Sequence, residues 1–173
     1  MKCFQLLVAI VLLALVTACT EQKAKQVDSE TEVVETVHIT PILKDLESEG
    51  ILKHYLLLKS ELIKSNGVQA QKYADTLNTA FTAAKNEKAF SITQKIAGSD
   101  NVKTQRSFFN QLTAEVEAIV RAKGLKSGTI YKQYCPMANN GDGAYWLSAE
   151  AEVKNPYYGD EMLSCGEVKE EIK

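Results

Sequence analysis

Apolar residues recur at helical spacing over residues 42–63, the first long segment of the chain with this period. Thr40 is a suitable helix cap, and Pro41 suits the first helical position because its missing N–H would have no partner there. Asn66 and Gly67 form a typical stop signal. The pattern therefore predicts a long amphipathic helix whose buried face carries Ile42, Leu43, Leu46, Leu52, Tyr55, Leu56, Leu62 and Ile63.

Three further segments show the same period. A second helix is expected over 68–85, a short third helix within 86–98, and a fourth from a cap at Ser99–Asp100 to about Lys123, where Gly124 ends it. Successive amphipathic helices with short connections favour an antiparallel bundle. We therefore expect a mainly α fold, with the apolar stripes packed in its core.

The character of the chain changes after Gly124. Turn sequences occur at 140–143 and 155–159, and short β-rich runs occur at 129–131 and 144–147. This segment, about 124–173, is predicted to form a loop-rich C-terminal cap on the helical bundle, with a small β-hairpin.

The chain begins with a short basic start and an apolar run over 6–15, followed by Val16, Thr17, Ala18 and Cys19. These are the parts of a secretory signal, and the run is too short to span a membrane. The four residues resemble the lipobox of bacterial lipoproteins. That resemblance implies cleavage of a signal peptide over 1–18 and a lipid anchor on Cys19, with a lipid-anchored, periplasm-facing protein in the cell envelope.

Residues 19–38 are polar and aperiodic, which predicts a flexible tether before a domain at 39–173. The whole chain has 20 basic and 22 acidic residues. Removing the leader removes Lys2 alone, leaving 19 against 22 and a net charge of −3. A mildly acidic protein without a basic field is not expected to bind nucleic acid.

Two cysteines remain after processing, each with a methionine close by. Met137 follows Cys135, and Met162 precedes Cys165. One interpretation is a disulfide, the usual state of two cysteines in an exported protein, which would stabilise the cap by roughly 3 to 4 kcal/mol. The other is a soft-metal site, because thiolates and thioethers select Cu(I) over hard cations. Spacing leaves both open.

The sequence does not favour a histidine metal site or an enzyme active site. Two histidines, His38 and His54, are too few and too far apart for a histidine metal cluster. There is no phosphate loop, nucleophile elbow or histidine-rich catalytic motif, and the carboxylates Asp142, Asp160 and Glu161 fall in turns. We therefore expect no enzymatic activity.

The ordered series YCPMANNGDGAYWLS, NPYYG and MLSCGEV resembles the C-terminal signature of a bacterial domain-of-unknown-function family, the one numbered 3347. The preceding helices are also similar, so the resemblance covers about 41–172. It implies an envelope protein associated with heavy-metal efflux components, and Cys135, Met137, Met162 and Cys165 as copper ligands. The Cys-Pro-Met segment that begins this signature also resembles a short heavy-metal-binding module whose motif reads YTCPMHP. In this sequence Ala138 and Asn139 stand where that module has His-Pro.

Two functions are therefore expected from the sequence. The first is a lipid-anchored domain that binds Cu(I) in support of metal efflux or homeostasis. The second is a disulfide-stabilised structural or protein-interaction module without metal. Candidates for its contact surface are Tyr145, Trp146, Tyr157 and Tyr158, although the sequence favours packing of these aromatics between the cap and the bundle.

Overall fold

The computed structural model of the protein describes residues 40–173. The predicted signal peptide over 1–18, the lipid-bearing Cys19, the tether over 19–38 and His38 lie outside the described residues. Within the described part of the chain, no helix is long and apolar enough to cross a membrane.

Four helices confirm the predicted bundle. Each begins at an Asp or Asn whose side chain accepts a hydrogen bond from a backbone N–H of the first turn, which satisfies an otherwise unpaired donor. The short third helix expected within 86–98 is present. The helices are α1 (Leu46–Ile63), α2 (Gly67–Ala83), α3 (Glu87–Ala97) and α4 (Val102–Lys123).

The predicted start of the first helix is wrong. Asp45, and not Thr40, caps α1, and Pro41 precedes a short strand, β1 (Ile42–Leu43), in place of a first helical turn. Antiparallel pairing with β2 (Leu125–Ser127), about eighty positions later, draws β1 away from the helix. Two other boundaries also move: Asn66 and Gly67 cap and begin α2, and the cap of α4 is Asn101.

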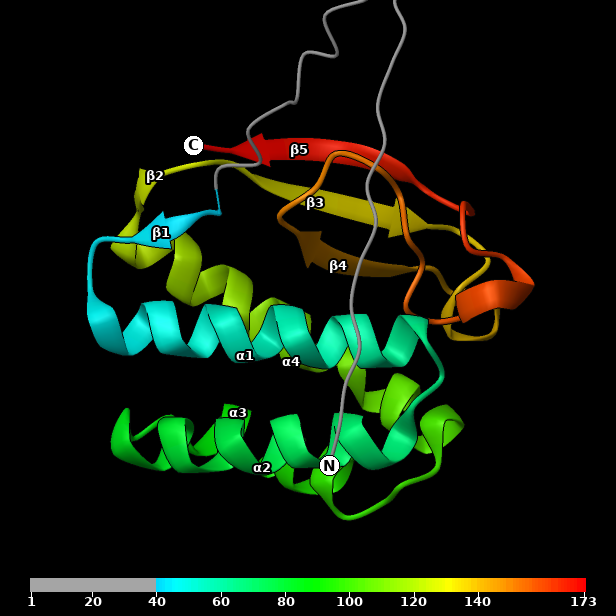
Figure 1. The fold of residues 1–173 in the computed structure, drawn as a ribbon, viewed down its shortest axis with the longest axis horizontal. Helices are drawn as coiled ribbons and strands as arrows, with labels where there is room; N and C mark the ends of the chain where they lie inside the picture. Colours follow the sequence, from blue (N-terminus) through cyan, green and yellow to red (C-terminus); the bar gives the residue numbers. More distant parts are fainter. Residues whose placement is uncertain (1–39) are drawn as a thin grey trace, which may run out of the picture. The chain divides into compact units, whose positions relative to one another are not determined.

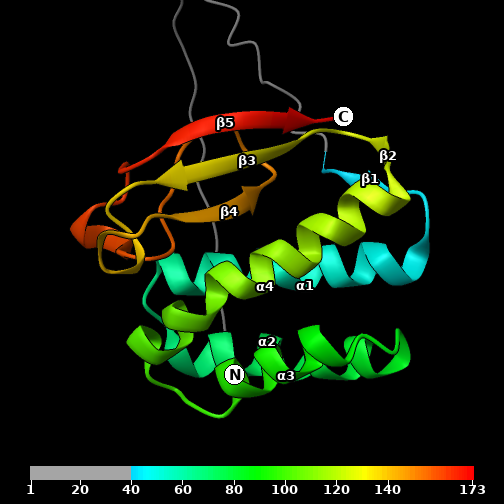
Figure 2. The same ribbon diagram turned by 180° about the vertical axis from the view of Figure 1, so that it is seen from behind.

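The helices form two layers, with α1 and α4 in one and α2 and α3 in the other (Figures 1 and 2). Their apolar faces meet in one core of fully buried side chains. The rings of Tyr55 and Phe109 stack with centroids 5.1 Å apart and join α1 to α4. The most deeply buried large members of the helical core include Tyr55, Phe81, Phe109, Leu58, Leu62, Leu77, Ile96 and Leu112.

A three-stranded antiparallel sheet forms most of the C-terminal cap. Its strands are β3 (Ile130–Cys135), β4 (Ala144–Ser148) and β5 (Glu167–Ile172), in the order β4-β3-β5. The predicted hairpin is present as β3 and β4. The third strand was not expected, since its sequence is almost wholly charged and exposed.

The sheet stands with β4 towards the α1–α4 layer and β5 farthest from it (Figure 1). Side chains of the helices bond the outer edge of β4: Asn110 accepts from the backbone N–H of Tyr145 at 3.0 Å, and the Tyr55 hydroxyl accepts from that of Leu147 at 3.0 Å. A strand edge buried on a helical layer needs such partners. These two hydrogen bonds hold the cap on the bundle. They therefore help to set the position of the sheet that carries Cys135.

Candidate functional site

Strand β3 places Cys135 at its last position, where the residue pairs with Ala144 of β4. The Cys135 side chain is fully buried. Because β3 is the central strand, paired with both β4 and β5, the thiol is held by the sheet.

Cys165 reaches the same place because β5 returns antiparallel to β3. Tyr134 pairs with Glu167 at the start of β5, so the residues just before β5 lie beside Cys135. Gly166 permits the close approach. Its φ is +138°, and a Cβ there would lie 2.8 Å from both the Trp146 ring and the Tyr134 carbonyl oxygen. The antiparallel return thus brings together two thiols thirty positions apart.

Both cysteines are free thiols in this structure, and they interact. The pKa of the Cys165 thiol is raised to about 11, first by a hydrogen bond with Cys135 and then by burial and by the charge of Cys135. Two neighbouring thiols resist ionising together, because the second negative charge would face the first. We call Cys135 and Cys165 the thiol pair. The two thiols of the pair therefore lie within hydrogen-bonding reach of each other.

The two methionines lie in the turns next to the thiol pair. Met137 stands after β3 with its side chain 52% exposed. Met162 caps the short helix η2 (Gly159–Glu161), and its carbonyl accepts from the Cys165 backbone N–H at 3.1 Å. The structure therefore places both methionine backbones beside the thiols.

Residues 155–159, which the sequence predicted only as a turn, hold the two methionine-bearing turns in place. The carboxamide of the fully buried Asn155 donates to the Cys165 carbonyl at 2.8 Å and accepts from the Tyr157 backbone N–H at 2.8 Å. The Tyr158 hydroxyl donates to the Met137 carbonyl. Hydrogen bonds to backbone carbonyls fix the path of a chain whatever side chains it carries. Residues 155–159 are therefore the scaffold of the thiol pair.

No group of three or more His, Cys, Asp or Glu side chains placed to hold a metal occurs among residues 40–173. A structural zinc site normally needs four such ligands, so the described residues do not provide one. The Nδ1 atom of His54 lies 2.8 Å from the Gly50 carbonyl oxygen of its own helix. A metal at the thiol pair would have two cysteine ligands, with only thioethers in addition.

Two of the four candidate contact aromatics are buried, which agrees with the favoured packing role and not with a contact surface. Trp146 is fully buried, with its Nε1–H donating to Gln133 Oε1 at 2.6 Å, and Tyr157 is also buried, with its hydroxyl donating to the Tyr145 carbonyl at 2.7 Å. Tyr145 is partly exposed, and Lys132 lies over its ring. These aromatics mainly pack the cap onto the bundle, so they do not form a continuous exposed surface.

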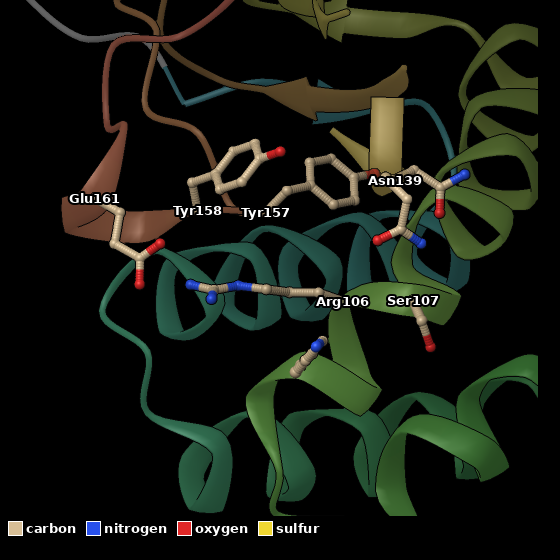
Figure 3. Close-up of a pocket in the computed structure, with 8 residues that line it drawn as sticks. Arg106, Ser107, Asn139, Tyr157, Tyr158 and Glu161 are labelled. Carbon is tan, nitrogen blue, oxygen red and sulfur yellow. The ribbon is translucent and has the colours of Figure 1, made fainter. Parts of the chain in front are cut away.

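A polar pocket of about 430 Å³ opens beside the methionine-bearing turns (Figure 3). Its walls include Arg106 from α4, Asn139 from the short helix η1 (Asn139–Gly141), Tyr158, and Glu161 from η2. No local sequence pattern indicates this pocket, because its walls come from three separate segments.

The geometry defines the class of protein: a four-helix domain with a β-containing cap that carries a pair of interacting thiols. Residues 51–128 match the model of a family described as "Protein of unknown function (DUF3347)", which confirms over those residues the resemblance stated above. The match runs from α1 to the end of β2, so the thiol pair and its scaffold lie outside it. No curated protein and no solved structure matches the chain.

Proposed function

We propose that this protein is a lipid-anchored envelope domain that binds a soft heavy-metal ion, Cu(I), at the thiol pair in support of metal efflux or homeostasis. The observation that carries the proposal is the contact between the Cys135 and Cys165 side chains. Thiolates are soft ligands, and Cu(I) is the common biological ion that suits a site of few sulfur ligands. Met137 and Met162 are the auxiliary ligands, since their turns adjoin both thiols.

Metal binding at this site must displace thiol protons. The raised pKa of Cys165 means that its proton is held more firmly than that of an ordinary thiol. The apparent affinity for Cu(I) therefore rises with pH, because fewer protons have to be released at higher pH. The dependence extends to higher pH than it would for a site with an ordinary thiol pKa.

A competition titration of the reduced protein against a coloured Cu(I) chelator tests the proposal. We expect one Cu(I) per chain and loss of that site in the Cys135→Ser, Cys165→Ser double variant. Ser164→Ala is the matched control, because it changes an exposed neighbour of Cys165 and keeps both thiols. Equal stoichiometry in the wild type and the double variant would overturn the proposal.

The same two thiols support an alternative function without metal. Oxidation of the pair by an envelope thiol oxidant would form one S–S bond, release two protons and pass two electrons to the oxidant. The product would be a disulfide-stabilised structural module. Alkylation and mass measurement of protein taken from the envelope distinguish the two states, since a bridged pair takes up no alkylating reagent.

The lipid anchor is supported by the order of residues at the end of the leader, Val16-Thr17-Ala18-Cys19. Labelling with radioactive palmitate in growing bacteria tests it. We expect label on the membrane-bound wild type and none on Cys19→Ser. The control is Cys3→Ser, which changes the leader's other cysteine and should keep the label. Equal label on the wild type and Cys19→Ser would contradict the anchor.

A further inference from the structure

The polar pocket adjoins both sulfur-bearing turns. Asn139, on one wall, follows Met137 by two positions, and Glu161, on the opposite side, directly precedes Met162. Tyr158 lines the pocket and donates its hydroxyl to the Met137 carbonyl. A molecule in this pocket would therefore lie against the turns that hold the thiol pair.

The pocket favours a negatively charged group. Lys103 and Arg106 come from the first turns of α4, the end of a helix where the backbone dipole also favours anions. Glu161 faces Arg106 and offsets one positive charge. No carboxylate within residues 40–173 pairs with Lys103. One cationic side chain thus remains for a ligand.

The floor of the pocket is rigid. The Arg106 guanidinium donates to the Pro156 carbonyl at 2.7 Å and to the Leu62 carbonyl at 2.7 Å, so its position does not depend on a ligand. Figure 3 shows Arg106 extending below Tyr157 and Tyr158, with Asn139 and Ser107 at the other end. A carboxamide and a hydroxyl add hydrogen-bonding groups that orient a small polar molecule. A volume of about 430 Å³ is of the size of small-molecule sites.

We propose that this pocket binds the carboxylate of a small thiol ligand that carries Cu(I) to the thiol pair, an inference that rests on the proposed function. In the transfer step a Cys135 or Cys165 thiolate forms a bond to the metal and the carrier's thiolate leaves. The proton displaced from the protein thiol passes to the departing carrier. The oxidation state of copper does not change, so no oxidant or reductant is needed.

Backbone-amide NMR of the reduced, metal-free protein tests the pocket by itself. Mercaptopropionate, which has a carboxylate, should shift the signals of Ser107, Asn139 and Tyr158. Mercaptoethanol, a neutral thiol, should not. Binding of the anion should weaken as salt is added, since the attraction is between partly exposed charges. Equal shifts with the two thiols, or none with either, would overturn the pocket assignment.

Variants connect the pocket to metal transfer. Lys103→Ala should weaken mercaptopropionate binding roughly threefold, the size expected for one exposed charge. It should also slow Cu(I) transfer from the mercaptopropionate complex by a similar factor, and leave transfer from the mercaptoethanol complex unchanged. Lys126→Ala is the matched control, an exposed lysine on β2 away from the pocket.

The two proposals fail in different ways. Anion binding at the pocket without any Cu(I) binding by the wild type would overturn the proposed function and leave the pocket as an anion site. Cu(I) binding with no effect of Lys103→Ala on either carrier would overturn the carrier pocket alone.

Discussion

The Nζ atom of Lys59 on α1 donates a hydrogen bond to the Oγ atom of Ser148 on β4 at 3.0 Å, and both side chains are buried. Burial lowers the pKa of Lys59 to about 8, and the charge of Glu150 offsets this in part. The pair joins the helical layer to the sheet that positions the thiol pair. Burying the charged amine of Lys59 lowers the stability of the folded protein, because the charge loses its hydration.

The free energy of unfolding should therefore rise with pH over the interval between the folded and the unfolded pKa of Lys59. The unfolded lysine titrates near 10.5 and the folded one near 8, so between these values the unfolded state binds more protons. Replacing the amine by Lys59→Met should stabilise the protein at pH 7 by roughly 3 kcal/mol, since each pKa unit corresponds to about 1.4 kcal/mol. The advantage should shrink towards pH 10.5. Urea unfolding at several pH values measures this.

The control for that experiment is Lys53→Met, an exposed position on the same helix, which should change stability little at any pH. The thiol pair also titrates in this range, but its contribution is common to all three proteins. A loss of stability in Lys59→Met at pH 7 would contradict the account of Lys59 as a costly buried charge.

The contact between the two thiols predicts the opposite pH dependence: here the free energy of unfolding should fall as pH rises. Because the folded pKa of Cys165 is raised to about 11, the folded state holds its proton longer than the unfolded state does. The resulting stability is present below the unfolded pKa, near 9, and is lost as pH rises towards 11. Cys135→Ala should return the pKa of Cys165 towards 9, measured by the ultraviolet absorbance of the thiolate.

Met137→Leu serves as the comparison for that titration, since it leaves both thiols in place and should leave the pKa of Cys165 raised. An unchanged thiolate titration in Cys135→Ala would show that the two side chains do not interact, and the metal proposal would lose its basis.

The scaffold predicts a specific effect on one thiol. Asn155→Ala removes two hydrogen bonds at a fully buried position and leaves the Cys165 carbonyl and the Tyr157 N–H without that partner. We expect a loss of roughly 2 to 4 kcal/mol in the free energy of unfolding. We also expect faster alkylation of Cys165 in the native state. In Tyr158→Phe, which frees the Met137 carbonyl instead, the alkylation rate of Cys165 should be unchanged.

Gly50 offers a test of the helical layer that is independent of the site. It lies inside α1, and a Cβ at this position would meet nothing within 4 Å. Gly50→Ala should therefore stabilise the protein by about 0.5 to 1 kcal/mol, because alanine loses less backbone entropy in a helix. Thermal unfolding measures the change. A decrease in stability would mean that the helix end is packed differently.

The sequence was a good guide wherever structure depends on local pattern. Helical spacing found α1 to α4, and alternation with turn residues found the β3–β4 hairpin. It failed where a distant partner decides. Thr40 and Pro41 look like a helix start, yet pairing with β2 makes the next residues a strand. The charged segment of β5 has no apolar alternation and was not predicted as a strand, yet pairing with β3 makes it an edge strand.

The candidate site was predictable in its thiols and not in its surroundings. The sequence singled out the two thiols of the cap, but the return of β5 that brings them together is a tertiary contact. Asn155 looked like a turn residue and is instead the buried link to Cys165. The pocket depends on α4, η1 and η2 meeting, which no local pattern records.

X-ray absorption of the reduced protein loaded with one equivalent of Cu(I) measures the ligands of the metal directly. The account predicts a first shell made of sulfur atoms alone, with loss of that signal when Cys135 and Cys165 are both replaced by serine. A first shell of nitrogen or oxygen atoms, or a sulfur shell that survives the double replacement, would contradict it.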